Sequence, residues 1–406
     1  MPLSSNDPST VDLGDVDLFA KGAPYDVFAR LRRDAPVHWN AKADGAGFWN
    51  LTRHPDVFAV SQDSTSFSSA DRGIMIFDPD DEAPRPPMMI EMDPPTHTRY
   101  RSLVNRAFTP RRVAGLRDYA AKLVEGIVGD ALAKRRCDFV RDVAAVLPLQ
   151  IILEMMGVDP SQRDPFFDLA NRVMGFSDPE FGELDEGENV AAQAEMAAFA
   201  RRLAEEKALR PGDDLASELL SVEVDGEKLT PTEFDLFFLL LVTAGSETTR
   251  SAIAGGVRSF HQFPEQWRRL GEDRSLLPAA IEEILRYTTP IHHFRRTATR
   301  DLEIRGTKIR AGDKVVVWYS SANRDEDVFV EPNRFDVART PNEQLSFGFG
   351  RHFCLGANLA RLELRVMLEA LLDRDAVAEP AGPVEYMRSN FAHSMKRMPV
   401  DLVARS

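Results

Sequence analysis

One cysteine, Cys354, lies in a glycine-rich loop whose sequence strongly constrains the kind of ligand that the fold can hold. This cysteine loop, residues 347–356, reads FGFGRHFCLG, and a helical pattern follows over 357–372. Free N–H groups and partial positive charge at a helix start favour an ionised sulfur. Glycines let the backbone bend sharply and approach a flat ligand. A thiolate presented in this way suits a haem iron, where it favours O–O bond cleavage.

Two other interpretations of Cys354 are weaker. An isolated intracellular cysteine is most often a buried structural residue in a tight turn. A zinc site would need further ligands. The only other cysteine, Cys137, is far away in the sequence, and the chain has no CxxC spacing.

A long helix is predicted between residues 230 and 263. Thr230 and Glu233 form a capping box, with a proline at the first helical position, and Pro264 ends the helix. Its middle, residues 244–249, reads AGSETT. Glycine and polar residues inside a helix cost stability, and such conflicts are expected at functional sites. Taken alone, the segment could also be a kink that allows close helix packing.

The same segment has the groups that oxygen chemistry needs. Ala244 and Gly245 are small enough to leave room for a diatomic ligand above a flat cofactor. Thr248 can hydrogen-bond dioxygen, and Glu247 can relay protons from solvent. We therefore interpret Glu247 and Thr248 as catalytic candidates.

Together the two segments resemble the cytochrome P-450 superfamily. The haem-loop pattern of that family is matched in full at Phe347, Gly350, His352, Cys354 and Gly356. The oxygen-activation motif is matched at Ala244, Gly245, Glu247 and Thr248. The resemblance runs from about residue 93 to the C-terminal region. It implies haem b with Cys354 as the iron ligand, and dioxygen as co-substrate.

The resemblance also implies roles for residues elsewhere in the chain. Four positions are expected to bind the haem propionates: His97, Arg101, Arg296 and His352. Arg295 is a neighbouring alternative to Arg296. A structural network that supports the haem loop is expected from Glu283, Arg286 and Arg334.

Several segments resemble the actinobacterial subgroup that hydroxylates methyl-branched lipids and cholesterol-type side chains. A substrate pocket is expected from apolar residues of the irregular stretch 64–95, the mid-chain helices, the long helix and the C-terminal region. These are Met88, Met89, Met174, Phe176, Val242, Ala244, Ile291, Phe294 and Phe391. Alternative functions are oxidation of another small apolar or aromatic metabolite, direct use of peroxide, and ligand binding by a haem sensor without turnover.

The overall composition agrees with such an enzyme. The 406 residues have a net charge of −14, which argues against nucleic acid as partner. The polar N-terminus and the absence of an apolar run of about 18–20 residues predict a cytoplasmic protein without a membrane span. We expect a mainly α chain with small β-sheets, a loose N-terminal arm over 1–20 and one catalytic domain over 21–406. The haem should lie between the long helix and the cysteine-loop helix. The resemblance implies electrons from NAD(P)H through a ferredoxin reductase and a ferredoxin, or similar carriers, and we expect a monomer.

Overall fold

The computed structural model describes residues 10–42, 47–78, 87–175, 177–181, 186–223 and 226–405. The helices are α1 Tyr25–Asp34, α2 His54–Gln62, α3 Thr96–Val104, α4 Pro110–Gly115, α5 Arg117–Lys134, α6 Val146–Met155, α7 Phe166–Met174, α8 Glu186–Leu209, α9 Leu215–Ser221, α10 Pro231–Gln262, α11 Pro264–Glu272, α12 Leu277–Thr288, α13 Tyr319–Ala322 and α14 Ala357–Asp373. The strands are β1 Val37–Asn40, β2 Phe48–Leu51, β3 Phe67–Ser68, β4 Arg136–Asp138, β5 His293–Ala298, β6 Leu302–Ile304, β7 Thr307–Ile309, β8 Lys314–Trp318, β9 Ala376–Pro380, β10 Glu385–Tyr386, β11 Met395–Arg397 and β12 Pro399–Ala404. The expected mainly α chain with small sheets is confirmed.

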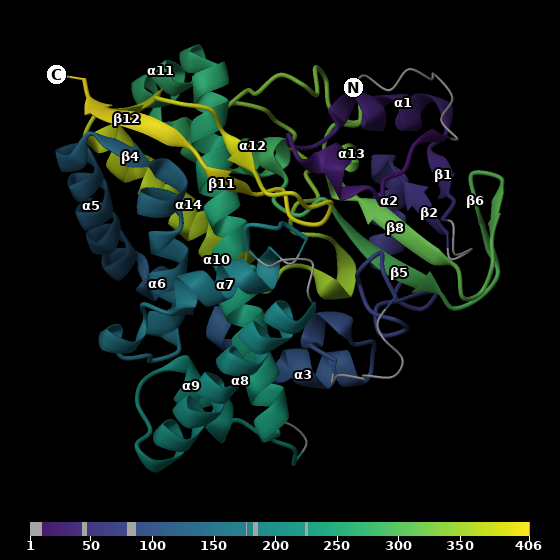
Figure 1. Ribbon diagram of the computed structural model, residues 1–406, viewed down its shortest axis with the longest axis horizontal. Coiled ribbons are helices and arrows are strands. Elements are labelled where there is room, and N and C mark those ends of the chain that lie inside the picture. The colour runs from purple at the N-terminus through teal and green to yellow at the C-terminus, as the bar shows by residue number, and fades with distance from the viewer. Residues whose placement is uncertain are drawn as a thin grey trace.

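Helix α10 runs through the middle of the molecule (Figure 1). Its predicted capping box is present: the N–H of Glu233 donates to the Thr230 hydroxyl at 3.2 Å, and the N–H of Thr230 donates to the Glu233 carboxylate at 2.8 Å. Helices α6, α7, α8, α12 and α14 pack around it. The long helix is therefore the scaffold to which the other helices are attached.

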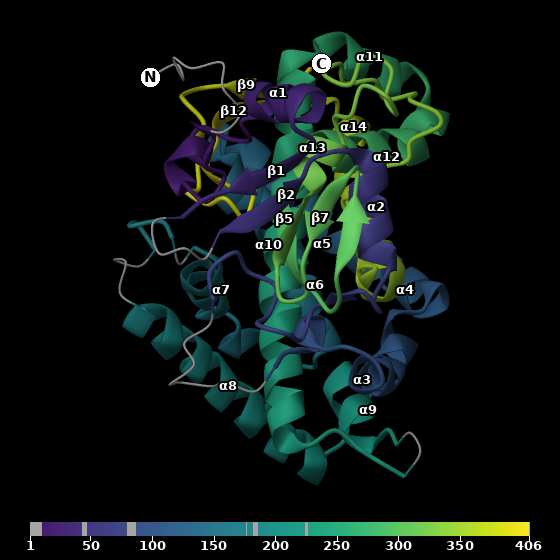
Figure 2. The same cartoon turned by 90° about the vertical axis from the view of Figure 1, so that its right-hand side faces the viewer.

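A mixed sheet lies to one side of α10, in the strand order β1-β2-β8-β5-β3 (Figure 2). Strands β2 and β8 are parallel, and the other neighbours are antiparallel. Strand β8 is buried along its whole length, as its β-branched sequence favours. Successive side chains of a strand point to opposite faces, so β5 directs Arg295 and Arg296 in opposite directions.

The N-terminal residues 10–20 are not a loose arm, and this prediction was wrong for that part of the chain. Val11, Leu13 and Phe19 are buried, with exposed fractions of 4%, 0% and 1%. The ring of Phe19 stacks on Trp318 of β8 at a centroid distance of 5.6 Å. The acidic residues between them hide this apolar pattern in the sequence. Residues 1–9 lie outside the described part.

The described residues of the stretch 64–95, which are 64–78 and 87–95, are largely irregular, as predicted, apart from β3 and one 3₁₀ turn at Met89–Glu91. Ile74 and Ile76 are nevertheless buried. Part of this stretch therefore packs into the core.

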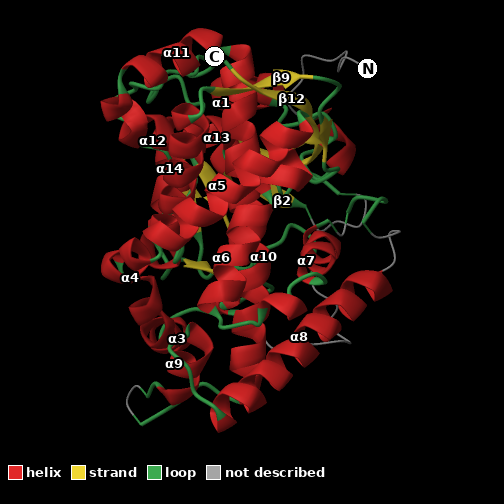
Figure 3. Cartoon of the chain, turned by 90° about the vertical axis from the view of Figure 1, so that its left-hand side faces the viewer, coloured by secondary structure: helices red, strands yellow, loops and turns green. Residues whose placement is uncertain are grey.

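Helix α14 follows the cysteine loop directly and packs on α5, α10 and α12 (Figure 3). Within the described ranges, we find no helix that is both long enough and apolar enough to cross a bilayer.

Candidate active site

The cysteine loop is fixed by its own backbone. The N–H of Cys354 donates to the carbonyl of Phe347 at 2.9 Å, which closes the loop. Gly350 has a φ of +71°, in the left-handed region that side chains disfavour. A Cβ at this position would lie only 2.6 Å from the carbonyl oxygen of Ser61. The loop therefore requires glycine at 350, and Gly356 then serves as the N-cap of α14.

The side chain of Cys354 is accessible to solvent, although protein groups enclose it closely. Burial raises the pKa of the Cys354 thiol, while the N–H of Gly356 and the charges of Arg101 and Arg361 lower it. An accessible sulfur with positive charge beside it can bind a metal as a thiolate.

One face of α10 is partly exposed within an otherwise buried stretch. Between Phe237 and Val257 every residue is buried except five, which recur at helical spacing along one side. These five, the open stripe, are Leu240, Leu241, Ala244, Gly245 and Thr248. A face that the protein itself does not cover is expected where a ligand lies.

Two members of the open stripe also shape the helix itself. The hydroxyl of Thr248 donates to the carbonyl of Ala244 at 2.7 Å. A Cβ on Gly245 would lie 2.5 Å from the side chain of Ile152 in α6. The absence of a side chain at Gly245 therefore also lets α6 approach α10, and the room that it leaves for a diatomic ligand stays a prediction.

Glu247 lies on a different side of α10 and is 2% exposed. Its carboxylate forms an ion pair with Arg250, one helical turn further along. The Arg250 guanidinium also donates to the side-chain oxygen of Asn171 in α7 at 2.7 Å. The acid of the motif is therefore held away from solvent by a buried arginine.

Four cationic or titratable side chains from three parts of the chain come together near the cysteine loop. This cationic cluster consists of His97, Arg101, Arg296 and His352. The rings of His97 and His352 are 4.3 Å apart. Burial, followed by the charges of Arg296, His97 and Arg101, lowers the pKa of His352 to about 2. Burial and the charges of Arg101 and Arg351 lower the pKa of His97 to about 4.

The structure distinguishes Arg296 from its neighbour. Arg295 forms an ion pair with Asp78 at 2.7 Å. The guanidinium of Arg296 instead donates to the backbone carbonyl of Arg295 at 2.7 Å. Arg296 is thus the arginine of this pair whose charge is not already neutralised by a carboxylate.

These residues fit a haem. Among the described residues, no carboxylate lies within ion-pair distance of any member of the cationic cluster. The Nε2 atoms of His97 and His352 are buried without a hydrogen-bond partner in the same described set. The charges of Arg101 and Arg296 therefore lack an ion-pair partner, and an anionic ligand such as a propionate would supply one. A sulfur ligand and an open helix face complete the set of groups that a haem needs.

A second buried ionic group supports the same region, and it corrects one prediction. Glu283 binds Arg286 through two hydrogen bonds, at 2.7 and 2.8 Å, and both residues are fully buried. The third member is Arg339, whose Nε lies 3.0 Å from Glu283. The side chain of Arg334 is half exposed and pairs with Glu331 instead. The Glu283 network therefore consists of Glu283, Arg286 and Arg339.

The backbone carbonyl of Arg334, unlike its side chain, does take part in the Glu283 network. It accepts hydrogen bonds from Arg286 at 3.2 Å and from Arg339 at 3.0 Å. The segment is in the predicted place, but its side chain points to the surface.

Four of the predicted pocket residues meet in one small apolar cluster. This apolar cluster is built from Met75, Met174, Phe181, Ile291, Phe294, Met387, Phe391 and Ala392. The rings of Phe294 and Phe391 are 5.6 Å apart. The stretch 64–95 contributes Met75 rather than the two methionines that were predicted.

Three other predicted pocket residues lie elsewhere. Met88 and Met89 pack on the main helical core. Val242 is fully buried in that core, between turns of the open stripe, so its assignment to the pocket was wrong. Phe176 lies outside the described residues.

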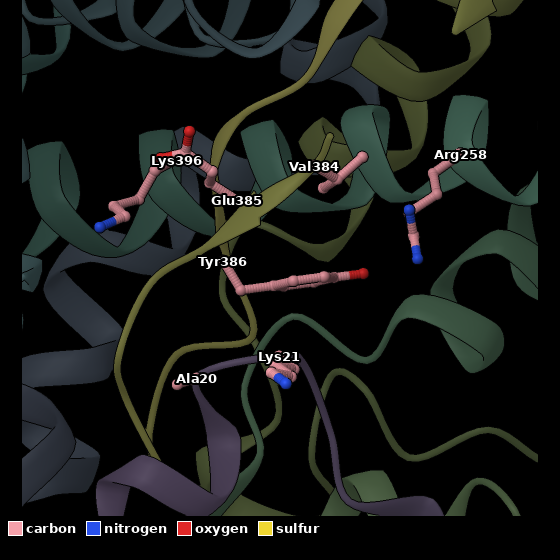
Figure 4. A pocket seen from close by; sticks show the side chains of 7 residues that line it. All are labelled: Ala20, Lys21, Arg258, Val384, Glu385, Tyr386 and Lys396. Atoms are coloured by element: carbon pink, nitrogen blue, oxygen red, sulfur yellow. The ribbon is translucent and has the colours of Figure 1, made fainter. Parts of the chain in front are cut away.

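A surface hollow of about 450 Å³ lies at the β10–β11 hairpin, apart from this site (Figure 4). Its lining includes Lys21, Arg258, Lys396 and Tyr386, whose hydroxyl points toward Arg258 in this view. It shares no residue with the cysteine loop, the open stripe or the apolar cluster. Its charged lining is unsuited to an apolar ligand.

Comparisons with known proteins agree with this geometry. The family model described as Cytochrome P450 matches residues 12–390. The chain belongs to the cytochrome P450 family, the haem-thiolate enzymes that use dioxygen, and it is an oxidoreductase of the monooxygenase class.

Two relatives and one solved structure illustrate the similarity. A methyl-branched lipid omega-hydroxylase of Mycobacterium tuberculosis is 43% identical, with 96% of this chain and 94% of that protein covered. A steroid C26-monooxygenase of the same species is 38% identical, with 99% and 95% covered. The structure of Mycobacterium marinum cytochrome P450 CYP268A2 in complex with pseudoionone has a TM-score of 0.90 at 36% identity, covering 98% of this chain and 100% of that one.

Sequence reasoning missed several residues that the fold brings to the site. Arg250 follows Glu247 by three positions, a spacing that places both on one helix face and could have indicated the pair. Asn171 and Arg339 carried no comparable signal, because their partners are 79 and 56 positions away.

Proposed function

We propose that this monooxygenase inserts one oxygen atom of dioxygen into a C–H bond of a methyl-branched lipid or of a sterol side chain. The observation that carries this proposal is the apolar cluster, which gathers aliphatic, thioether and aromatic side chains from four separate segments. Methionine adapts to irregular apolar ligands, and aromatic rings give broad apolar contact. The two relatives named above, whose names give a methyl-branched lipid and a steroid as substrates, support the same class.

We assign the haem to three groups of residues in the chain. Cys354 would be the thiolate ligand of the iron, and the four members of the cationic cluster would bind the propionates. The open stripe of α10 would contact the haem and its oxygen ligand. When bound, the haem supplies the dioxygen activation and the oxidising power of the reaction.

The other residues bind, orient and move protons. The apolar cluster would hold the alkyl chain and exclude water from it. Thr248 Oγ would receive a proton and pass it on, because its hydroxyl can both donate and accept. Glu247 would supply that proton from its carboxyl group.

Electrons would come from NAD(P)H through a ferredoxin reductase and a ferredoxin, and we propose that the enzyme acts as a cytoplasmic monomer. Members of the family generally take electrons from such redox partners. An acidic protein needs a local basic patch for docking an acidic ferredoxin.

An optical titration of the purified haem-loaded protein tests the substrate class. Branched-chain lipids and sterols should displace water from the iron and shift its spin state, and straight-chain fatty acids and small aromatics should shift it less. The product of the best ligand should then carry a hydroxyl on a terminal or branch carbon. A thiolate-type spectrum with no response to any lipid would retain the enzyme class and reject the proposed substrate.

A further inference from the structure

The clearest unexplained feature lies on the side of α10 behind the open stripe. A small cavity of about 10 Å³ is bordered by Ser246, Glu247, Arg250 and Asn171, together with apolar residues of α6 and α7. Helices α6 and α7 pack directly on α10 at this level (Figure 1). This volume is about the minimum that holds one water molecule.

Several buried polar atoms at this cavity lack a partner within the described part of the chain. They are Oε1 of Glu247, and Nε and Nη2 of Arg250, although Nη2 lies within ion-pair distance of the other carboxylate oxygen. Glu247 and Arg250 are 2% and 5% exposed. An unpaired buried acceptor next to an unpaired buried donor is unfavourable unless a water bridges them.

The arginine itself is fixed from a second helix. Arg250 donates to Asn171 Oδ1 at 2.7 Å, and this amide is 6% exposed. Two partners on different helices, Glu247 on α10 and Asn171 on α7, fix the guanidinium plane. The orientation of the Glu247 carboxylate therefore depends on Asn171, which does not touch it.

We propose that Arg250 and Asn171 are positioning residues for Glu247, and that the cavity beside them holds one water molecule that bridges Glu247 Oε1 and Arg250. The inference rests on the proposed function, because Glu247 matters only if the reaction needs a proton. It adds two residues and one water molecule that aim the carboxylate.

The chain offers a closely matched control. Arg163 is also 5% exposed, pairs with the carboxylate of Glu154 at 2.6 Å and donates to the amide oxygen of Gln150 at 2.9 Å. Arg163→Met removes a buried arginine with the same two kinds of partner, and also two bonds to the Val158 carbonyl at 3.0 and 2.8 Å, without touching Glu247. Loss of stability alone should therefore affect both variants.

The test compares haem-loaded wild type, Arg250→Met, Asn171→Leu and Arg163→Met. Arg250→Met and Asn171→Leu should lower product formed per electron several-fold, with peroxide released instead, and should raise the solvent isotope effect on product formation. Their reduced CO spectrum and lipid-induced spin shift should match wild type. Arg163→Met should form as much product per electron as wild type. Asn171→Leu keeps the test valid if Arg250→Met does not fold.

A high-resolution crystal structure of the haem-loaded enzyme gives a readout besides turnover. A water within hydrogen-bond distance of Glu247 Oε1 and Arg250 is expected, and its absence would overturn the water site. Wild-type coupling and isotope effect in Asn171→Leu would overturn the positioning role. If wild type itself shows no thiolate-type spectrum and no lipid response, the proposed function has failed, which is a separate result.

Discussion

Two groups of basic side chains in this protein have opposite surroundings. In the Glu283 network, the carboxylate of Glu283 accepts hydrogen bonds from both arginines, and Asp336 N–H and Asn342 add two more at 2.9 and 3.2 Å. In the cationic cluster, no described carboxylate lies within ion-pair distance, and Asp93 acts on His97 and Arg296 only through space. Buried charges are tolerated only when paired. The first group is therefore complete without a ligand, whereas the second requires an anionic one.

The largest loss of stability is expected from a substitution that breaks the Glu283 network. Glu283→Ala would leave Arg286 and Arg339 buried without their carboxylate, at a cost of about 3–5 kcal/mol in the free energy of unfolding. Chemical denaturation of the purified variant, or its failure to accumulate as folded protein, measures this. A loss below about 1 kcal/mol would show that the network does not support the fold.

A buried histidine can also remain neutral, as the lowered pKa values of His97 and His352 indicate. His293 is fully buried, its Nδ1 bonds the Asn390 carbonyl at 2.9 Å, and burial lowers its pKa to about 4 from an ordinary 6.5. The unfolded chain therefore binds a proton between these two pH values while the folded chain does not. Stability from His293 is full above pH 6.5 and decreases by about 3 kcal/mol as the pH falls to 4.

His293→Asn tests this acid sensitivity, since asparagine retains a donor for the Asn390 carbonyl but cannot take up a proton. The free energy of unfolding of the variant should change less than that of wild type between pH 6.5 and pH 4. Equal slopes for the two proteins would contradict the assignment.

A member of the cationic cluster should behave in the opposite way to Glu283. Arg296→Leu removes a charge that lacks a counter-charge, so the haem-free chain should be as stable as wild type or more stable. Haem binding should weaken by about 1.5–3 kcal/mol, the usual contribution of a hydrogen bond to a charged group. Haem transfer to apomyoglobin measures the affinity, and loss of stability without loss of haem would refute the proposed role.

The smallest change in stability is expected at Arg334, and it distinguishes this residue from Arg339 in the same segment. Arg339→Met removes a direct partner of Glu283 and should cost about 1.5–3 kcal/mol. Arg334→Ala removes a half-exposed surface pair and should change stability by less than about 0.5 kcal/mol. Denaturant melts of both variants decide which arginine belongs to the network, and equal losses would restore Arg334 to it.

The parts of the site that sequence could predict are those built from neighbouring residues. The cysteine loop, the capping box of α10 and the segment around Glu247 and Thr248 each depend on local spacing, and the fold places them in the expected elements. The identity of the third arginine could not be predicted in this way. Arg334 and Arg339 are five positions apart, and only the path of the intervening turn decides which side chain reaches Glu283.

The predicted pocket failed for a related reason. Val242 and Ala244 lie two positions apart on α10, which corresponds to opposite sides of a helix. Composition could not determine which side the core would cover. The burial of Val11 and Leu13 likewise depends on a partner surface that is distant in sequence.

The reduced CO spectrum of the haem-loaded protein tests the central claim, that Cys354 is the haem ligand, most directly. Wild type and Cys137→Ser should both show a thiolate-type band, because burial raises the pKa of the Cys137 thiol to about 11 and keeps it protonated. Cys354→Ser should fold but lose that band. A thiolate-type band in Cys354→Ser, or none in haem-loaded wild type, would contradict the account.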